Sequence, residues 1–184
     1  MFRASIIAFA TLAFLRAATA TDYCTLKNDM KNFHAYAKPP TCQTMGEGYY
    51  SFVLSLTDTC VPSFEGGFDG CVDGNAIAIY DNTCKKVGHY SLGDDLPNDC
   101  GIPYAINEPW VPYQVSIQEI DKSIGGGYFK FAYANGLYTI GNNGCICSGI
   151  SGSSLQAHTV CGCAFPIHGE PTKIKGRSPA LESY

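Results

Sequence analysis

Residues 22–37 place apolar side chains at steps of three and four along the chain, on Tyr23, Leu26, Met30, Phe33 and Ala37. This spacing aligns them on one face of a helix. Thr21 or Asp22 can cap the N-terminus of such a helix, and Pro39-Pro40 ends the pattern. The sequence therefore predicts one N-terminal helix, with Cys24 near its start in a position to attach it to the rest of the domain by a disulfide.

Beyond residue 48 the pattern changes to the two-residue alternation that is typical of strands. We predict strands over residues 49–57, 76–80, 87–91 and 113–118. Three turn-forming pairs, Gly66-Gly67, Asp69-Gly70 and Asp73-Gly74, predict a loop over residues 62–75. Four prolines between residues 92 and 112 predict an irregular excursion that a disulfide ties to the domain.

Two Asn-Gly pairs organise the C-terminal third of the chain. Asn135-Gly136 separates two β-rich runs, residues 128–134 and 137–140, and Asn143-Gly144 precedes Cys145. Both residue types tolerate positive φ, which makes Asn-Gly a strong hairpin signal. A β-meander is therefore predicted, followed by a strand over residues 158–165.

These elements predict an α+β fold, in which the N-terminal helix packs on an antiparallel β-sheet that ends in the β-meander. Disulfides are expected to staple the sheet. We expect a single domain over residues 21–168, because no change of composition marks a boundary inside it. Residues 169–184 contain few apolar side chains and are predicted to form a flexible tail.

Residues 1–20 have the composition of a secretory signal peptide. Arg3 is followed by an apolar stretch over residues 4–15 and by Ala18-Thr19-Ala20, the small-residue pattern that signal peptidase requires. The apolar stretch is too short to span a bilayer. We therefore expect cleavage before Thr21 and a secreted, extracellular protein.

Ten cysteines follow this segment and none lies inside it: Cys24, Cys42, Cys60, Cys71, Cys84, Cys100, Cys145, Cys147, Cys161 and Cys163. An even number in an oxidising compartment predicts five disulfides. If the last two strands pair antiparallel about Ser154, Cys145 faces Cys163 and Cys147 faces Cys161. The alternatives are that each Cys-x-Cys pair bonds to earlier cysteines, or that four thiolates bind zinc. Disulfides are favoured, and no metal or other cofactor is expected.

The charge balance excludes two classes of partner. Without residues 1–20 the chain has ten lysines and arginines against sixteen aspartates and glutamates, a net charge of −6. Binding to nucleic acid or to an anionic membrane requires clusters of cations. We therefore expect neither of these partners, but a monomer that binds a host protein or a cell-wall glycan.

Few residue patterns point to catalysis. The histidines are His34, His89, His158 and His168, and one of them could form an acid–base pair with a carboxylate such as Glu119. Folding could bring His89 and Glu119 together, but the spacing alone does not show it. The segment from Asp69 to Asn75 only partly matches a calcium loop, because Cys71 occupies a ligand position. No catalytic residue is assigned.

Aromatic side chains near the predicted loops favour recognition. The candidates for a binding surface are Tyr49, Tyr50, Tyr90, Tyr104, Trp110 and Tyr113. Aromatic residues on ordered loops are typical of contacts with carbohydrate or protein. The competing interpretation is that they belong to the core of the sheet.

The N-terminal signal of residues 3–20, the ten cysteines, the Cys-x-Cys pairs and the single acidic domain resemble those of small secreted cysteine-rich proteins of filamentous fungi. Many of those proteins act as effectors or toxins on a host. The helix-on-sheet outline also looks like that of some fungal effector and killer-toxin-like folds. The resemblance covers the whole chain but rests on no family motif, so it assigns no residue.

We therefore expect a secreted effector-like or toxin-like protein that binds a host or cell-surface molecule without catalysis. The alternatives are a small secreted hydrolase, either a ribonuclease or a glycan-active enzyme, and a carbohydrate-binding wall protein. A histidine and a carboxylate converging in a cleft would favour the hydrolase. An exposed aromatic platform would favour glycan binding.

Overall fold

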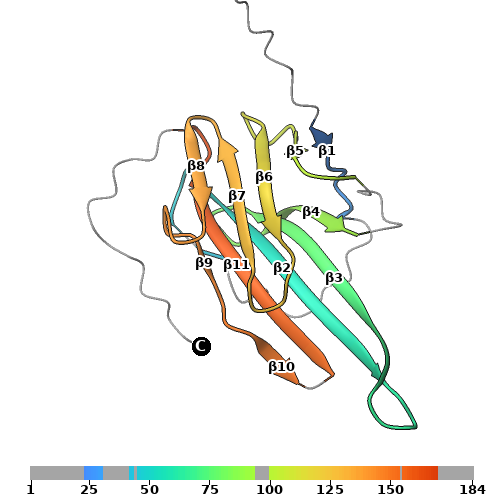
Figure 1. Cartoon of the computed structure of the whole chain (residues 1–184). Coiled ribbons are helices and arrows are strands. Elements are labelled where there is room, and N and C mark those ends of the chain that lie inside the picture. Colours follow the sequence, from blue (N-terminus) through green and yellow to red (C-terminus); the bar gives the residue numbers. More distant parts are fainter. Residues whose placement is uncertain (1–22, 31–41, 44, 94–99, 154, 170–184) are drawn as a thin grey trace, which may run out of the picture.

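The computed structural model describes residues 23–30, 42–43, 45–93, 100–153 and 155–169. These residues form two β-sheets, shown in Figure 1, and contain no α-helix. The strands are β1 (Cys24–Thr25), β2 (Tyr49–Pro62), β3 (Phe68–Tyr80), β4 (Lys86–Leu92), β5 (Tyr104–Ile106), β6 (Val115–Asp121), β7 (Tyr128–Tyr133), β8 (Gly136–Thr139), β9 (Ile146–Cys147), β10 (Ser151–Ser153) and β11 (Gln156–Pro166). No described helix is long and apolar enough to cross a membrane.

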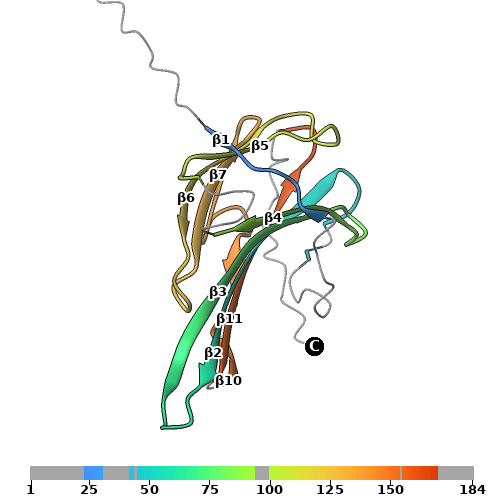
Figure 2. The same cartoon turned by 90° about the vertical axis from the view of Figure 1, so that its right-hand side faces the viewer.

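The five-stranded sheet has the order β1-β5-β6-β7-β8, and all its pairs are antiparallel except β1 with β5. The six-stranded sheet has the order β10-β11-β2-β3-β4, with β9 also paired to β11. Figure 2 shows the two sheets facing each other at one end of the molecule. The long strands β2, β3 and β11 continue beyond the five-stranded sheet at the other end.

Alternation along the strands builds the core between the sheets. On β2, Phe52, Leu54 and Leu56 are fully buried, and on β7 Phe129 and Phe131 are fully buried as well. The rings of Phe52 and Phe131 stack with their centroids 4.6 Å apart, which joins the two sheets directly. Burying side chains of this size contributes about 1.5–3 kcal/mol each. The shared core fixes the two sheets as one body.

The prediction of an α+β fold with an N-terminal helix is wrong. Cys24 and Thr25 form a strand that pairs parallel with β5, and the amide of Leu26 donates to the carbonyl of Ala105 at 2.8 Å. These bonds occupy backbone groups that a helix would use within itself. Leu26 is buried in the core from an extended backbone, whereas Met30 is 38% exposed. Tertiary pairing therefore outweighs the local periodicity; residues 31–37 of the predicted helix lie outside the described residues.

The predicted loop over residues 62–75 is also wrong for most of its length. β3 begins at Phe68, and β2 and β3 pair from Ser51–Tyr80 out to Pro62–Phe68. Only residues 63–67 form the turn, where Gly66 and Gly67 have φ of 92° and 89°. The glycines at positions 70 and 74 lie inside the strand. We call residues 57–74 the arm and the rest of the described residues the body.

The other strand predictions are confirmed in outline. β2, β4, β6, β7, β8 and β11 lie where alternation predicts strands. The first Asn-Gly turn is displaced by one residue, because Tyr133 pairs with Gly136 and the turn residues are Ala134 and Asn135. Asn143 and Gly144 have φ of 53° and 74°, which confirms the second turn. The signal peptide and residues 170–184 of the tail lie outside the described residues.

Candidate functional site

All ten cysteines are paired. The disulfides are Cys24–Cys100, Cys42–Cys84, Cys60–Cys71, Cys145–Cys163 and Cys147–Cys161. The last two are the pairs that antiparallel pairing about Ser154 predicts, and Cys147 faces Cys161 directly in the register. Five disulfides indicate an oxidising environment of the extracellular type.

The structure also brings together one group of potential metal ligands on the arm that the sequence analysis did not suggest. Asp58, Cys60 and Cys71 offer ligand atoms within 4.8 Å of one another, but the two sulfurs are bonded to each other. A disulfide supplies no thiolate, which is the form of cysteine that binds metal. The cluster is therefore a disulfide beside a carboxylate.

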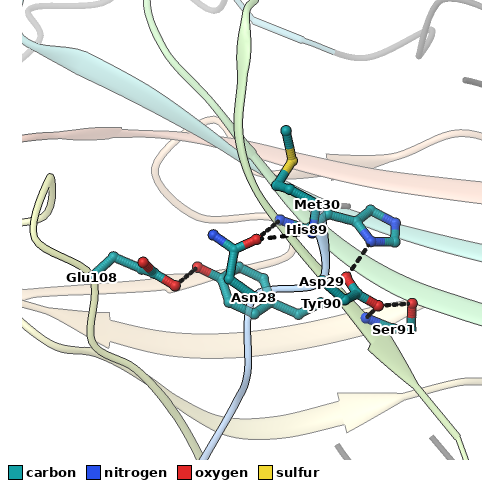
Figure 3. Close-up of polar contacts among 7 residues, drawn as sticks. All are labelled: Asn28, Asp29, Met30, His89, Tyr90, Ser91 and Glu108. Atoms are coloured by element: carbon teal, nitrogen blue, oxygen red, sulfur yellow. Dashed lines mark hydrogen bonds and ion pairs between the residues drawn. The ribbon is translucent and has the colours of Figure 1, made fainter. Parts of the chain in front are cut away.

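The N-terminal segment carries a buried polar cluster across the outer edge of β4, shown in Figure 3. One oxygen of Asp29 lies 2.6 Å from Nδ1 of His89, and its other oxygen accepts from the hydroxyl of Ser91 at 2.5 Å. Asp29 and His89 are each 9% exposed. The amide of Asp29 donates to the carbonyl of His89 at 2.9 Å, and Oδ1 of Asn28 accepts from the amide of His89 at 3.3 Å. The segment therefore covers the edge of β4, which protects it from further pairing.

A serine, a histidine and an aspartate meet in this cluster, but their order is not that of a nucleophile relay. In such a relay the serine hydroxyl donates to the histidine, and the aspartate orients the ring from the other side. Here the hydroxyl of Ser91 donates to Asp29. The carboxylate of Asp29 thus contacts both His89 and Ser91 on β4, which attaches the N-terminal segment to that strand.

Burial shifts the titration of groups around this cluster. Burial lowers the pKa of Lys86 to about 8, and the nearby carboxylate of Asp29 opposes that shift. Burial also raises the pKa of Tyr90, whose hydroxyl donates to Glu108 at 3.2 Å. Both shifts follow from desolvation of the charged form. Neither group reaches a described cavity.

The candidate acid–base residues are not brought together. Glu119 lies on β6 of the five-stranded sheet, where its carboxylate pairs with Lys130 at 2.7 Å and is exposed. A β-bulge between Ile117 and Glu119 reverses the alternation, so Glu119 does not follow the buried side chains of its strand. His158 lies on β11, with Nε2 3.4 Å from the hydroxyl of Ser55. His168 is exposed, and His34 lies outside the described residues.

The six candidate aromatic residues separate into two groups. Tyr90 and Tyr104 are 0% and 4% exposed and belong to the core, so they cannot contribute to a binding surface. Tyr50 and Trp110 are half-buried and meet edge to face with centroids 5.6 Å apart. Tyr49 is also half-buried, and Tyr113 is 48% exposed against the ring of Tyr133. The structure gives no single platform made of all six.

A shallow depression of about 550 Å³ lies beside the Cys24–Cys100 disulfide. Its lining residues are Cys100, Gly101, Ile102, Tyr104, Ile120, Asp121 and Lys122. Asp121 and Lys122 are the charged residues of this lining, which contains no histidine. The depression therefore suggests no reaction.

The arm is the part of the six-stranded sheet that the sequence analysis did not predict in full. Its exposed apolar side chains include Val61, Phe64 and Val72, which are 56%, 108% and 70% exposed. Leu155, 42% exposed, adjoins the arm, because its carbonyl accepts from the amide of Cys60 at 2.8 Å. Exposed apolar groups gathered on one projecting element are typical of a contact surface. Treating Asp-Gly pairs as turns concealed this surface.

Comparison with known proteins gives no relative: no family model, no curated protein and no solved structure matches the chain.

Proposed function

We propose that the protein is secreted after cleavage of residues 1–20 and acts, like an effector or toxin, by binding a host or cell-surface molecule without catalysis. The arm carries this proposal. It extends beyond the five-stranded sheet in both views of the molecule. The side chain of Phe64, at its turn, is exposed. A soluble protein that exposes large apolar side chains on a projecting hairpin leaves them uncovered at a cost, which binding to a partner would offset.

The disulfides support the same proposal. Cys60–Cys71 joins the two strands of the arm, and Cys147–Cys161 joins β9 to β11 in the body. A surface that is already ordered loses less conformational entropy when it binds. The Cys60–Cys71 disulfide thus keeps the arm ordered, although the core does not cover it.

The groups available for catalysis support binding over turnover. His89 is held by Asp29, and Glu119 is held by Lys130 on the other sheet. Neither pair lies in a described cavity that would admit a substrate. The hydrolase therefore has no specific observation in its favour.

The test uses the purified, oxidised chain without residues 1–20, carrying a fluorescent label. We expect saturable binding to intact eukaryotic cells, competed by unlabelled protein and abolished by reduction of the disulfides. Turnover is measured in parallel on RNA and on a panel of wall polysaccharides, with alanine variants of His89, His158 and Glu119. Hydrolysis that one of these variants abolishes would overturn the proposal, as would the absence of saturable binding.

A further inference from the structure

The arm has one sheet edge that no described strand covers. β4 pairs with β3 only from Asn75 to Tyr80. Residues 68–74 therefore pair with β2 on one side and with no described strand on the other, and residues 70–74 are all exposed. Figure 1 shows this part of β3 on the outside of the arm. An exposed strand edge is a template for pairing with another chain.

The register shows which backbone groups point outward from this edge. Cys60 and Cys71 face each other with Cα atoms 4.0 Å apart, the short spacing of a pair that exchanges no backbone hydrogen bond. The amide of Cys60 donates to Leu155 on the opposite side of β2, which agrees with this assignment. By alternation, the N–H and C=O of Cys71 and Asp73 point away from β2. Those of Val72 point toward β2.

The disulfide keeps this edge in place. An uncovered hairpin end frays readily, because few buried contacts hold it. Cys60–Cys71 closes the hairpin next to the edge, four residues or fewer from the turn at residues 63–67. Known sheet edges are usually blunted by lysine, proline or a covering segment. Residues 68–74 of β3 contain no lysine or proline and pair with no described segment on this side, whereas the edge of β4 in the body is covered by residues 28–30.

Charge indicates what kind of strand would fit. The arm contains four acidic residues, Asp58, Glu65, Asp69 and Asp73, and no lysine, arginine or histidine. Asp58 and Asp73 are directly opposite each other in the register, so their side chains share one face. Two like charges in that position destabilise the pair, and a cation on a third strand beside Asp73 would relieve the repulsion. The other face presents Val72 to the same third strand.

We propose that residues 68–74 of β3 bind an extended, cationic segment of a partner protein by strand addition. The segment would place lysine or arginine on the face of Asp58 and Asp73 and an apolar side chain on the face of Val72. Main-chain hydrogen bonds from Cys71 and Asp73 would supply affinity, and the alternating side chains would supply specificity. This inference rests on the proposed function, since it names the surface and the partner class for the same binding.

Two other occupants fit less well. A second copy of this chain would bring the same acidic arm against the first, and the like charges would repel. A glycan lacks the regular row of amide and carbonyl groups that a strand edge pairs with. The partner is therefore a polypeptide with positive charge.

The experiment uses a fluorescent peptide as long as residues 68–74 that alternates lysine with valine and threonine, titrated into the oxidised chain without residues 1–20. One control peptide replaces each lysine by glutamate, and another carries N-methyl groups on all its internal amides, which removes the backbone donors of both edges. We expect binding by the lysine peptide that weakens as salt rises. Loss of binding is expected for both controls. Equal binding by the N-methylated peptide would overturn strand addition, and equal binding by the glutamate peptide would overturn the charge assignment.

Two variants at one position separate backbone from charge. Asp73→Asn removes the side-chain charge and keeps the backbone N–H, whereas Asp73→Pro removes both the charge and the backbone N–H. Proline is tolerated on an edge where the N–H faces solvent, so Asp73→Pro should fold, and its unfolding midpoint is measured beside that of Asp73→Asn. We expect Asp73→Pro to bind the lysine peptide about fivefold or more weakly than Asp73→Asn, the effect of one net hydrogen bond. Equal affinities would contradict the proposal, and the N-methylated peptide tests it on the unaltered chain if Asp73→Pro unfolds.

The proposed function and this inference fail in different ways. If the unaltered chain binds cells saturably and Asp73→Pro binds them equally well, the β3 edge is not the binding surface and the proposed function stands. If the unaltered chain binds no cells but binds the lysine peptide, the edge is competent and the proposed function fails. Peptide-induced or spontaneous dimerisation through β3, seen by analytical ultracentrifugation, would replace the cationic partner by a second copy and overturn the inference.

Discussion

The body and the arm are built from the same strands but are held together by different forces. In the body, β2 buries Phe52, Leu54 and Leu56 between two sheets. In the arm, the same strand continues with Asp58, Cys60 and Pro62, beyond the end of the five-stranded sheet in Figure 2. Burial stabilises the body, while backbone pairing and one disulfide stabilise the arm. Freed from packing, the arm's side chains can serve recognition.

The strongest test of this contrast is a phenylalanine in each region. Phe131 is fully buried and contacts the rings of Phe52 and Tyr138 at centroid distances of 4.6 and 4.9 Å. Phe131→Ala should lower the free energy of unfolding by about 3–5 kcal/mol, because it leaves a cavity. Phe64→Ala in the arm should change it by less than about 0.5 kcal/mol. Urea denaturation without reductant measures both, and similar losses would contradict the division.

A glycine in the body tests how tightly its sheet is packed. A Cβ on Gly136 would lie 2.6 Å from the hydroxyl oxygen of Tyr138. Gly136→Val should therefore cost about 2–3 kcal/mol of stability through overpacking. Leu137→Val, at the next and 44% exposed position, is the matched control and should have little effect. If the two variants unfold at the same urea concentration, Tyr138 is not fixed above Gly136.

The two cross-strand disulfides allow a direct comparison of arm and body. The Cys60→Ser/Cys71→Ser double variant should lose about 2 kcal/mol or less, at the low end for a removed disulfide, and should open mainly the arm. Cys147→Ser/Cys161→Ser should cost more, since Cys161 is fully buried in the core. Hydrogen exchange followed by mass spectrometry reports which peptides lose protection. Loss of protection throughout the body in the first variant would show that the arm is not a separate element.

The smallest expected effect concerns pH at the base of the arm. Burial lowers the pKa of His158, so the folded state favours the neutral ring and the unfolded chain takes up a proton more readily. This stability is present above about pH 6.5, the ordinary value, and is lost as pH falls through the lowered folded value. Unfolding free energies at pH 7.5 and pH 5 should therefore differ less in His158→Gln than in the unaltered chain. If the difference between the two pH values is the same in both proteins, His158 does not contribute to the pH dependence of stability.

Part of this structure follows from local rules and part does not. The Cys145–Cys163 and Cys147–Cys161 pairs were predictable, because two residues on one strand face must meet two on its antiparallel neighbour. The N-terminal helix was predicted wrongly. Local periodicity does not reveal that Cys24 pairs in parallel with Tyr104, eighty positions away. Local spacing carries no information about such distant partners.

The candidate site was less accessible to prediction than the fold. Asp-Gly pairs usually mark turns, so Asp73-Gly74 concealed an exposed strand edge whose existence depends on where β4 stops pairing. The contact of Asp29 with His89 joins positions 60 residues apart and leaves no local pattern. The aromatic residues gave a mixed outcome, because a tyrosine beside a loop, such as Tyr90, can still point into the core.

The uncovered edge of β3 is the central claim, and residue-resolved amide hydrogen exchange by NMR tests it most directly. In the free protein the amides of Cys71 and Asp73 should exchange rapidly, while that of Val72, directed toward β2, should be protected. Adding the lysine-alternating peptide should slow Cys71 and Asp73 and leave Val72 unchanged. Protection of Asp73 in the free protein, or no change on addition of a peptide that binds, would contradict the account.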